Sequence, residues 1–182
     1  MKATQQLKNE HAGIRTMLNI LEKVCEKLEK TGTMENGHVE GIIEFMQVFV
    51  DKCHHGKEED VLFPAMINAS DEAKAPAAAM CAEHETSRGY VGLMSRAYTA
   101  YVQGGISSSG DIVENARACI ALLRGHMAKE NDVILEVADR TFPDARQNEL
   151  FADFERIEEE RIGHGKHEEF HTLLEKLSSL YL

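Results

Sequence analysis

The chain contains two stretches that carry the same polar residues at the same helical spacing, and this repeat constrains its fold more than any other feature. CHHGKEEDVLFPAM occupies residues 53–66, and GHMAKENDVILEVA occupies residues 125–138. At an offset of 72 residues the two stretches share a His-x-x-x-Glu motif, with His54 over His126 and Glu58 over Glu130. An internal repeat of this kind predicts that the chain is built from two related halves.

The segments that precede these stretches repeat as well. NEHAGIR at residues 9–15 falls on AEHETSR at residues 82–88, at an offset of 73 residues. The shared residues are Glu10 with Glu83, His11 with His84, and Arg15 with Arg88. Each half is therefore predicted to be a helical hairpin that carries one His on its first helix and a His-x-x-x-Glu motif on its second.

Apolar periodicity predicts that both halves are helical. Apolar residues and the motif residues recur every three or four positions in successive segments, as expected for one face of a helix. Turn-forming residues separate these segments at TGTMENG (31–37), NASDE (68–72) and GGISSSG (104–110). Helices of similar length with short connections predict an all-α, up-down-up-down four-helix bundle.

The chain continues beyond these helices in a shorter acidic segment. We expect the bundle to occupy residues 1–140 and a C-terminal helical extension, residues 141–182, to pack on it. GHG at residues 163–165 predicts a break or kink within the extension. A length of 182 residues fits one domain with a substantial core.

The composition limits the classes of partner. A net charge of -11 argues against nucleic acid and against anionic membrane surfaces, both of which attract basic proteins. No apolar run approaches the roughly 20 residues of a membrane-spanning helix, and no signal peptide is evident. The four cysteines show no CxxC spacing, so we interpret them as reduced thiols of a cytoplasmic protein. The oligomeric state stays open, and a homodimer is compatible with the sequence.

The repeated polar residues lie on helix faces that should be buried. An i, i+4 spacing places the His and the Glu of each His-x-x-x-Glu motif on one face. A buried polar group without a partner costs roughly 1–3 kcal/mol, so groups in this position require ligands inside the bundle, and two divalent cations would satisfy them. The six residues are His11, His54, Glu58, His84, His126 and Glu130.

Together these residues resemble the hemerythrin-like HHE cation-binding proteins. The resemblance covers roughly residues 5–140 and rests on His11, on HHGKEEDVLFP, on His84 and on HMAKE. Ferritin-like di-iron bundles use Glu-x-x-His pairs with further Glu residues instead, and this chain does not show that arrangement.

The resemblance implies a non-heme di-iron centre with an oxo or hydroxo bridge. The implied ligands are His11 and His54 for one iron, His84 and His126 for the other, and Glu58 and Glu130 between them. Zinc or manganese can also occupy sites of imidazole and carboxylate, and zinc binds such sites more tightly than ferrous iron does. The preference for iron therefore rests on the resemblance.

The chain departs from the oxygen-carrying members of this family at one position. They have a further His one turn after the third-helix ligand, where this chain has Arg88, which cannot bind a cation. An open coordination position is therefore expected in place of simple reversible oxygen carriage. We hypothesise that the extension lies over the open end of the bundle and that its His167 supplies the missing ligand. His55 and Glu59, which directly follow expected ligands, are expected to face solvent.

The extension also contains HEEFH at residues 167–171, which matches the H-E-x-x-H helix of zinc metallopeptidases. A peptidase needs a third protein ligand, commonly well downstream, as well as a substrate cleft. Eleven residues follow the motif. We therefore interpret it as a chance match in a histidine-rich acidic helix.

The functional classes that remain all use the same centre. A centre of this family would bind a small diatomic or peroxide ligand, such as O2, NO or H2O2, for sensing, storage or detoxification. A redox enzyme or a protein that repairs damaged iron centres is the alternative, and a structural bundle that holds zinc is a third. The sequence does not distinguish an enzyme from a sensor.

Overall fold

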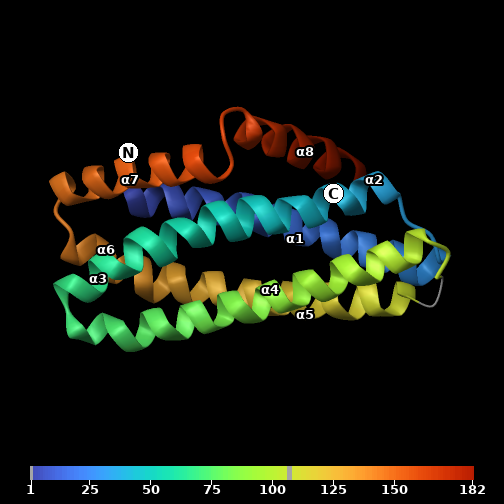
Figure 1. The fold of residues 1–182 in the computed structure, drawn as a ribbon, viewed down its shortest axis with the longest axis horizontal. Coiled ribbons are helices and arrows are strands. Elements are labelled where there is room, and N and C mark those ends of the chain that lie inside the picture. Colours follow the sequence, from blue (N-terminus) through green and yellow to red (C-terminus); the bar gives the residue numbers. More distant parts are fainter. Residues whose placement is uncertain (1, 106–107) are drawn as a thin grey trace.

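The structure is a computed structural model that describes residues 2–105 and 108–182. Within these residues all regular structure is helical (Figure 1), which confirms the all-α prediction. The helices gather into a bundle whose long axis runs horizontally in Figure 1. In the same part of the chain, no helix combines the length and the apolar character needed to cross a membrane.

The described chain places four long helical stretches along this axis. The first is α1 (Ala3–Thr31), and the third is α4 (Lys74–Val102), which follows the short 3-10 helix η3 (Asp71–Ala73). The second, the 36–69 helix, joins α2 (Asn36–Glu44), the π-helical segments η1 (Phe45–His55) and η2 (Glu58–Leu62), and α3 (Phe63–Ala69). The fourth, the 109–141 helix, joins α5 (Ser109–Lys129), the π-helical η5 (Glu130–Ile134) and α6 (Leu135–Thr141).

Glycines determine where two of the helices end. Gly32 takes a left-handed conformation (φ 69°) after α1, and its N–H donates to the carbonyl of Leu28. A side chain at this position would be strained, so glycine is the residue expected after such a helix. The extension consists of α7 (Asp144–Arg161) and α8 (Lys166–Tyr181), which are separated at Gly163 and Gly165, both with positive φ. The break predicted at GHG is confirmed.

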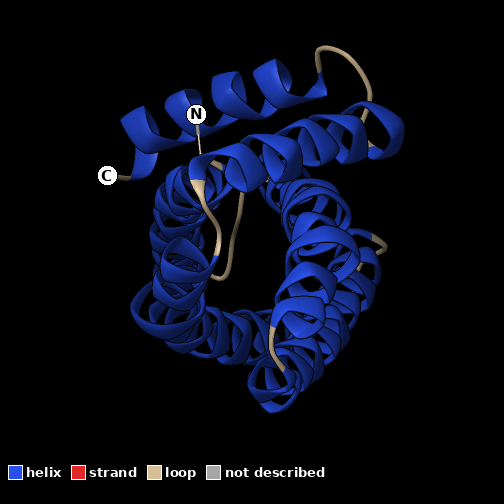
Figure 2. Cartoon of the chain, turned by 90° about the vertical axis from the view of Figure 1, so that its left-hand side faces the viewer, coloured by secondary structure: helices blue, strands red, loops and turns tan. Residues whose placement is uncertain are grey.

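The four stretches surround a common interior (Figure 2). Both α1 and α4 pack against α5 and against the 36–69 helix. The extension lies on the outside, with α7 and α8 both in contact with α1 and with η1. Figures 1 and 2 agree that these two helices run along the side of the bundle. The expectation that the extension covers an open end is therefore wrong.

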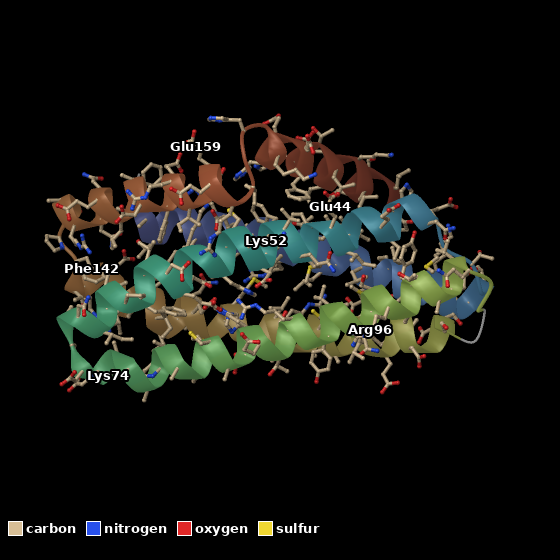
Figure 3. The ribbon with its side chains drawn as sticks, in the orientation of Figure 1. Glu44, Lys52, Lys74, Arg96, Phe142 and Glu159 are labelled. Carbon is tan, nitrogen blue, oxygen red and sulfur yellow. The ribbon has the colours of Figure 1, made fainter. Side chains whose placement is uncertain are left out.

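Two apolar clusters fill the interior, and a buried polar layer separates them. One cluster includes Ile14, Leu21, Phe45 and Phe170, and the other includes Leu7, Leu62, Leu135 and Phe154. Along the first three stretches the polar layer lies between the positions of the two clusters, and along the fourth it overlaps the first cluster at Met127. Its buried residues are Glu10, His11, His54, His55, Lys57, Glu58, His84, His126 and Glu130. Figure 3 shows side chains filling the interior, whereas Glu159 of α7 points away from it.

The extension contributes to this core through α8, which gives a first prediction. Phe170 is 3% exposed, and its ring lies 5.5 Å from that of Phe45. Phe170→Ala should lower the free energy of unfolding by about 3–5 kcal/mol, because it leaves a cavity and loses buried apolar area. Urea denaturation followed by circular dichroism measures the change. The matched control on the same helix is Leu180→Ala, at a position 58% exposed, where an equal loss would contradict the docking of α8.

Candidate metal centre

Two overlapping groups of side chains meet in the polar layer. The His11 group consists of His11, His54, Glu58 and Glu130, and the His84 group consists of His55, Glu58, His84 and His126. Within each group the potential ligand atoms all lie within 4.8 Å of one another, and every member is buried. The structure thus brings together the six bundle residues singled out by the sequence and adds a seventh, His55.

His55 was expected in solvent, and the structure corrects this expectation. Its side chain is buried at 1% exposure, and its ring stacks on that of His84 with centroids 3.8 Å apart. His54 and His55 are consecutive residues of the π-helical η1, and both face the interior. A π-helix has a wider turn than an α-helix, and such segments are frequent at functional sites. An expectation based on α-helical periodicity therefore placed His55 wrongly.

The histidines are oriented by hydrogen bonds at their Nδ1 atoms. The Nδ1 atoms of His54, His84 and His126 face the carboxylates of Glu10 (2.7 Å), Glu59 (2.6 Å) and Glu83 (2.9 Å), respectively. The Nδ1 of His11 faces the side-chain oxygen of Asn131 at 3.0 Å. Because each of these oxygens is an acceptor, each ring places its proton on Nδ1. The Nε2 atom is then left with an unprotonated lone pair, which is the form that binds a metal.

The Nε2 lone pairs face one another and the two central carboxylates. Nε2 of His11 lies 3.0 Å from Nε2 of His54, and that of His84 lies 2.9 Å from that of His126. Within the described structure, all four carboxylate oxygens of Glu58 and Glu130 are buried without a hydrogen-bond donor. The interior therefore gathers nitrogen and oxygen atoms that face one another, and the carboxylate oxygens among them lack a hydrogen-bond donor. Metal cations bound by nitrogen and oxygen atoms would satisfy this donor set.

Each central carboxylate presents one oxygen to each group. In Glu58, Oε1 lies 3.5 Å from Nε2 of His54, and Oε2 lies 3.4 Å from Nε2 of His84. In Glu130, Oε2 lies 3.2 Å from Nε2 of His11, and Oε1 lies 3.1 Å from Nε2 of His126. This arrangement fits two carboxylates that bridge two cations.

Burial keeps two of the imidazoles uncharged. It lowers the pKa of His54 to about 4 and that of His55 to about 3, although the hydrogen bond between His54 and Glu10 and the nearby carboxylate of Asp51 act in the opposite direction. Both rings are therefore neutral at pH 7. A neutral imidazole can bind a cation, whereas a protonated one cannot.

The two central carboxylates are electrostatically unequal. Burial and the neighbouring charge of Glu130 raise the pKa of Glu58 well above its ordinary value. Burial acts on Glu130 in the same direction, but contacts with the imidazoles of His11 and His126 hold the pKa of Glu130 below its ordinary value. Two like charges in a buried site repel each other, so one of them tends to take up a proton unless a cation is present.

A second set of charged residues supports the ligand positions in each half. Lys57 donates to Glu10 (2.6 Å) and to Glu158 of α7 (2.7 Å), and it is completely buried. Burial disfavours its charge, but the carboxylate of Glu10 raises the pKa of Lys57 above its ordinary value. The equivalent residue of the other half, Lys129, contacts Glu83 with its side chain 49% exposed. The extension therefore buries Lys57 of the first half but leaves Lys129 of the second half exposed.

Arg88 supports the other half from a different position. Its guanidinium donates to Asp51 (2.6 Å) and to Glu59 (2.8 Å). Glu59 in turn holds the Nδ1 of His84, and its side chain is 25% exposed. Glu59 was expected in solvent, and the structure instead places it in partly buried contacts with both residues. Arg88 thus positions His84 through Glu59.

His167 lies outside both groups. It belongs to α8, where its Nδ1 faces Glu158 at 2.7 Å and its Nε2 faces Nε2 of His171 at 3.0 Å. Its position therefore does not support the hypothesis that it completes the centre. His55, from the 36–69 helix, occupies the place of an additional imidazole beside His84 and His126. The adjacent His-His pair was the sequence signal that could have identified it.

Comparison with family models gives a match over most of the chain. The model described as Hemerythrin HHE cation binding domain matches residues 2–138. The matched residues include every member of the two groups and end before α7. Comparison with curated proteins and comparison with solved structures gave no significant match.

The shared position of Glu58 leads to a prediction about metal binding. Glu58→Gln keeps the shape of the side chain but removes its charge, so the metal content of the purified protein should fall by at least half. Without metal, the same variant should be more stable than the parent by about 1–3 kcal/mol. The reason is that a neutral amide replaces a buried carboxylate that has no hydrogen-bond donor. Metal analysis and urea denaturation in a chelator measure the two effects. Glu114→Gln, an exposed position on α5, is the control and should change neither.

The position of His55 leads to a second prediction. His55→Ala should weaken metal binding by about tenfold or more, as expected when a ligand or an immediate support is removed. Competition with a chromogenic chelator measures the affinity. His164→Ala removes a histidine whose side chain is 89% exposed and should leave the affinity unchanged. Equal affinities for His55→Ala and the parent would place His55 outside the ligand set.

Proposed function

The chain belongs to the hemerythrin HHE cation-binding family, and from this premise we propose that it holds two iron ions and binds a small oxidant or gas at them. The resemblance seen in the sequence is confirmed by the family match, and the family binds metal cations. The proposed ligands are O2, NO or H2O2, and the proposed role is sensing, storage or detoxification. The proposal includes the up-down-up-down topology of a four-helix bundle.

The observation that carries the proposal is the buried set of imidazole nitrogens and carboxylate oxygens, in which the carboxylates lack hydrogen-bond donors. The Nε2 atoms of His11, His54, His84 and His126 and the oxygens of both central carboxylates face one another inside the polar layer. Mixed imidazole and carboxylate ligands suit iron, and they also accept zinc and manganese. The choice of iron follows from the family premise.

The residues divide unequally between two ions. His11 and His54 would hold the first ion, and His55, His84 and His126 would hold the second, with Glu58 and Glu130 between them. The first ion would have one imidazole fewer than the second. When bound, the metal pair would supply redox chemistry and a place for the small ligand.

A cavity offers a route for such a ligand. It has a volume of about 240 Å³ and is lined by residues of the 36–69 helix and of α4, among them His55, Ser87, Arg88 and Gly92. His55 is both part of this lining and a member of the His84 group. A molecule the size of O2, NO or H2O2 fits such a cavity. The apolar clusters on both sides of the polar layer keep bulk water away from the centre.

The cysteines do not favour a competing thiol mechanism. All four are free, and burial raises the pKa of Cys53 to about 12 and that of Cys119 to about 11. These two side chains therefore stay protonated at neutral pH, and a protonated thiol is a poor nucleophile toward peroxide. Redox chemistry in this chain would accordingly depend on the metal centre. A redox enzyme or an iron-centre repair protein that uses the same centre is the alternative function.

Metal analysis and rapid mixing test the proposal. Protein purified without oxygen should contain two iron ions per chain, and its reduced form should bind O2 or NO reversibly in a stopped-flow spectrometer. Continuous consumption of peroxide or NO would instead support the enzyme. A chain that contains zinc and no iron, and that does not react with any of the three ligands, would contradict both.

The proposed route gives its own prediction. Gly92→Phe should slow association of NO or O2 by about tenfold or more, because Gly92 lines the cavity and an added Cβ there meets only Arg96, at 3.7 Å. Gly89→Phe is the matched control on the same helix, since an added Cβ at Gly89 meets nothing within 4 Å. Iron content should be unchanged in both variants. Equal association rates in the two variants would show that the ligand enters elsewhere.

A further inference from the structure

A second cavity lies between the bundle and the extension, and no member of the His11 or His84 group lines it. Its volume is about 300 Å³, and its lining comes from α1, from η1 and from α8. Aromatic rings of Phe49 and Phe170 form part of the wall, and Glu10 forms another part. His167 and His171, the two histidines of the HEEFH sequence, also line this cavity.

We propose that His167 and His171 bind one divalent transition-metal ion at this cavity, as a mononuclear site separate from the di-iron centre. The two residues are one helical turn apart on α8, and their Nε2 atoms lie 3.0 Å apart. Two imidazoles bound side by side to one ion at about 2.0–2.1 Å place their nitrogens about 3 Å apart. The same separation occurs between the histidines that face each other in the candidate centre, at 3.0 and 2.9 Å.

A carboxylate orients His167, as other carboxylates orient His54, His84 and His126 in the candidate centre. Nδ1 of His167 faces Oε1 of Glu158 at 2.7 Å, which equals the distance between His54 and Glu10. Donation from Nδ1 to this carboxylate leaves the lone pair of Nε2 directed toward His171. Glu158 is itself fixed by Lys57, at 2.7 Å from its other oxygen. His167 therefore has the orientation of a metal ligand.

The class of ion follows from the ligands. Two imidazoles without a thiolate favour Ni²⁺, Cu²⁺ or Zn²⁺ over Mg²⁺ or Ca²⁺. Among the described residues no third His, Cys, Asp or Glu joins this pair closely enough to complete a three-residue site. The remaining coordination positions face the cavity, where water or a small ligand can fill them. A site with two protein ligands binds its ion more weakly than the buried centre does and exchanges it readily.

Calorimetric titration with Ni²⁺ tests the proposal on the full-length, iron-loaded chain. The parent protein should bind one Ni²⁺ per chain in addition to its iron. His171→Gln and His167→Gln should each weaken this binding by about tenfold or more. Glu158→Gln should weaken it as well, because the carboxylate that orients His167 is lost. Iron content, measured after each titration, should be the same in the parent and in both histidine variants.

His164→Gln is the matched control, since it removes a histidine of the same extension whose side chain is 89% exposed. Its Ni²⁺ affinity should equal that of the parent. The 3.0 Å contact could also be a hydrogen bond between the two rings, and in that case the parent and the His171→Gln variant would bind Ni²⁺ equally, which overturns the proposal. Because the readout is the difference between these proteins, it holds whichever metal occupies the central site.

Discussion

The structure depends on a buried layer of imidazole and carboxylate groups that face one another as acceptors. The protons on Nδ1 are directed outward to Glu10, Glu59 and Glu83, so the Nε2 atoms and the central carboxylates meet without a donor between them. Such an interior is costly without a cation. The apolar clusters on both sides hold the helices together around this layer.

The extension makes two nearly symmetric halves different. In the first half, Glu158 of α7 covers Lys57, which is completely buried and fixes the Glu10 that orients His54. In the second half, Lys129 remains half-exposed beside Glu83. A buried ion pair is screened less by solvent than an exposed one. The lysine that supports the His11 group is therefore buried whereas its counterpart is exposed, although the repeated motifs are the same.

Much of this fold and of its centre could be predicted from the sequence, because both depend on periodicity. The i, i+4 spacing that buries an apolar face also brings His54 and Glu58 inward, so their position follows from the helix itself. The change from α-helix to π-helix could not be predicted in this way. The burial of His55 and of Lys57 therefore did not follow from the sequence pattern. The side on which α7 and α8 dock depends on tertiary contacts, such as that between Glu158 and Lys57, which no local pattern encodes.

Arg88 explains how the unexpected positions of His55 and Glu59 are related. The sequence suggested that the chain lacks one imidazole, because Arg88 stands one turn after His84 and cannot bind a cation. In the structure a neighbouring helix provides the imidazole of His55 against the ring of His84, with centroids 3.8 Å apart. Arg88 is then free to hold Glu59, which fixes the same ring through Nδ1. His84 is thus positioned by a stacked imidazole on its face and by a carboxylate at its edge.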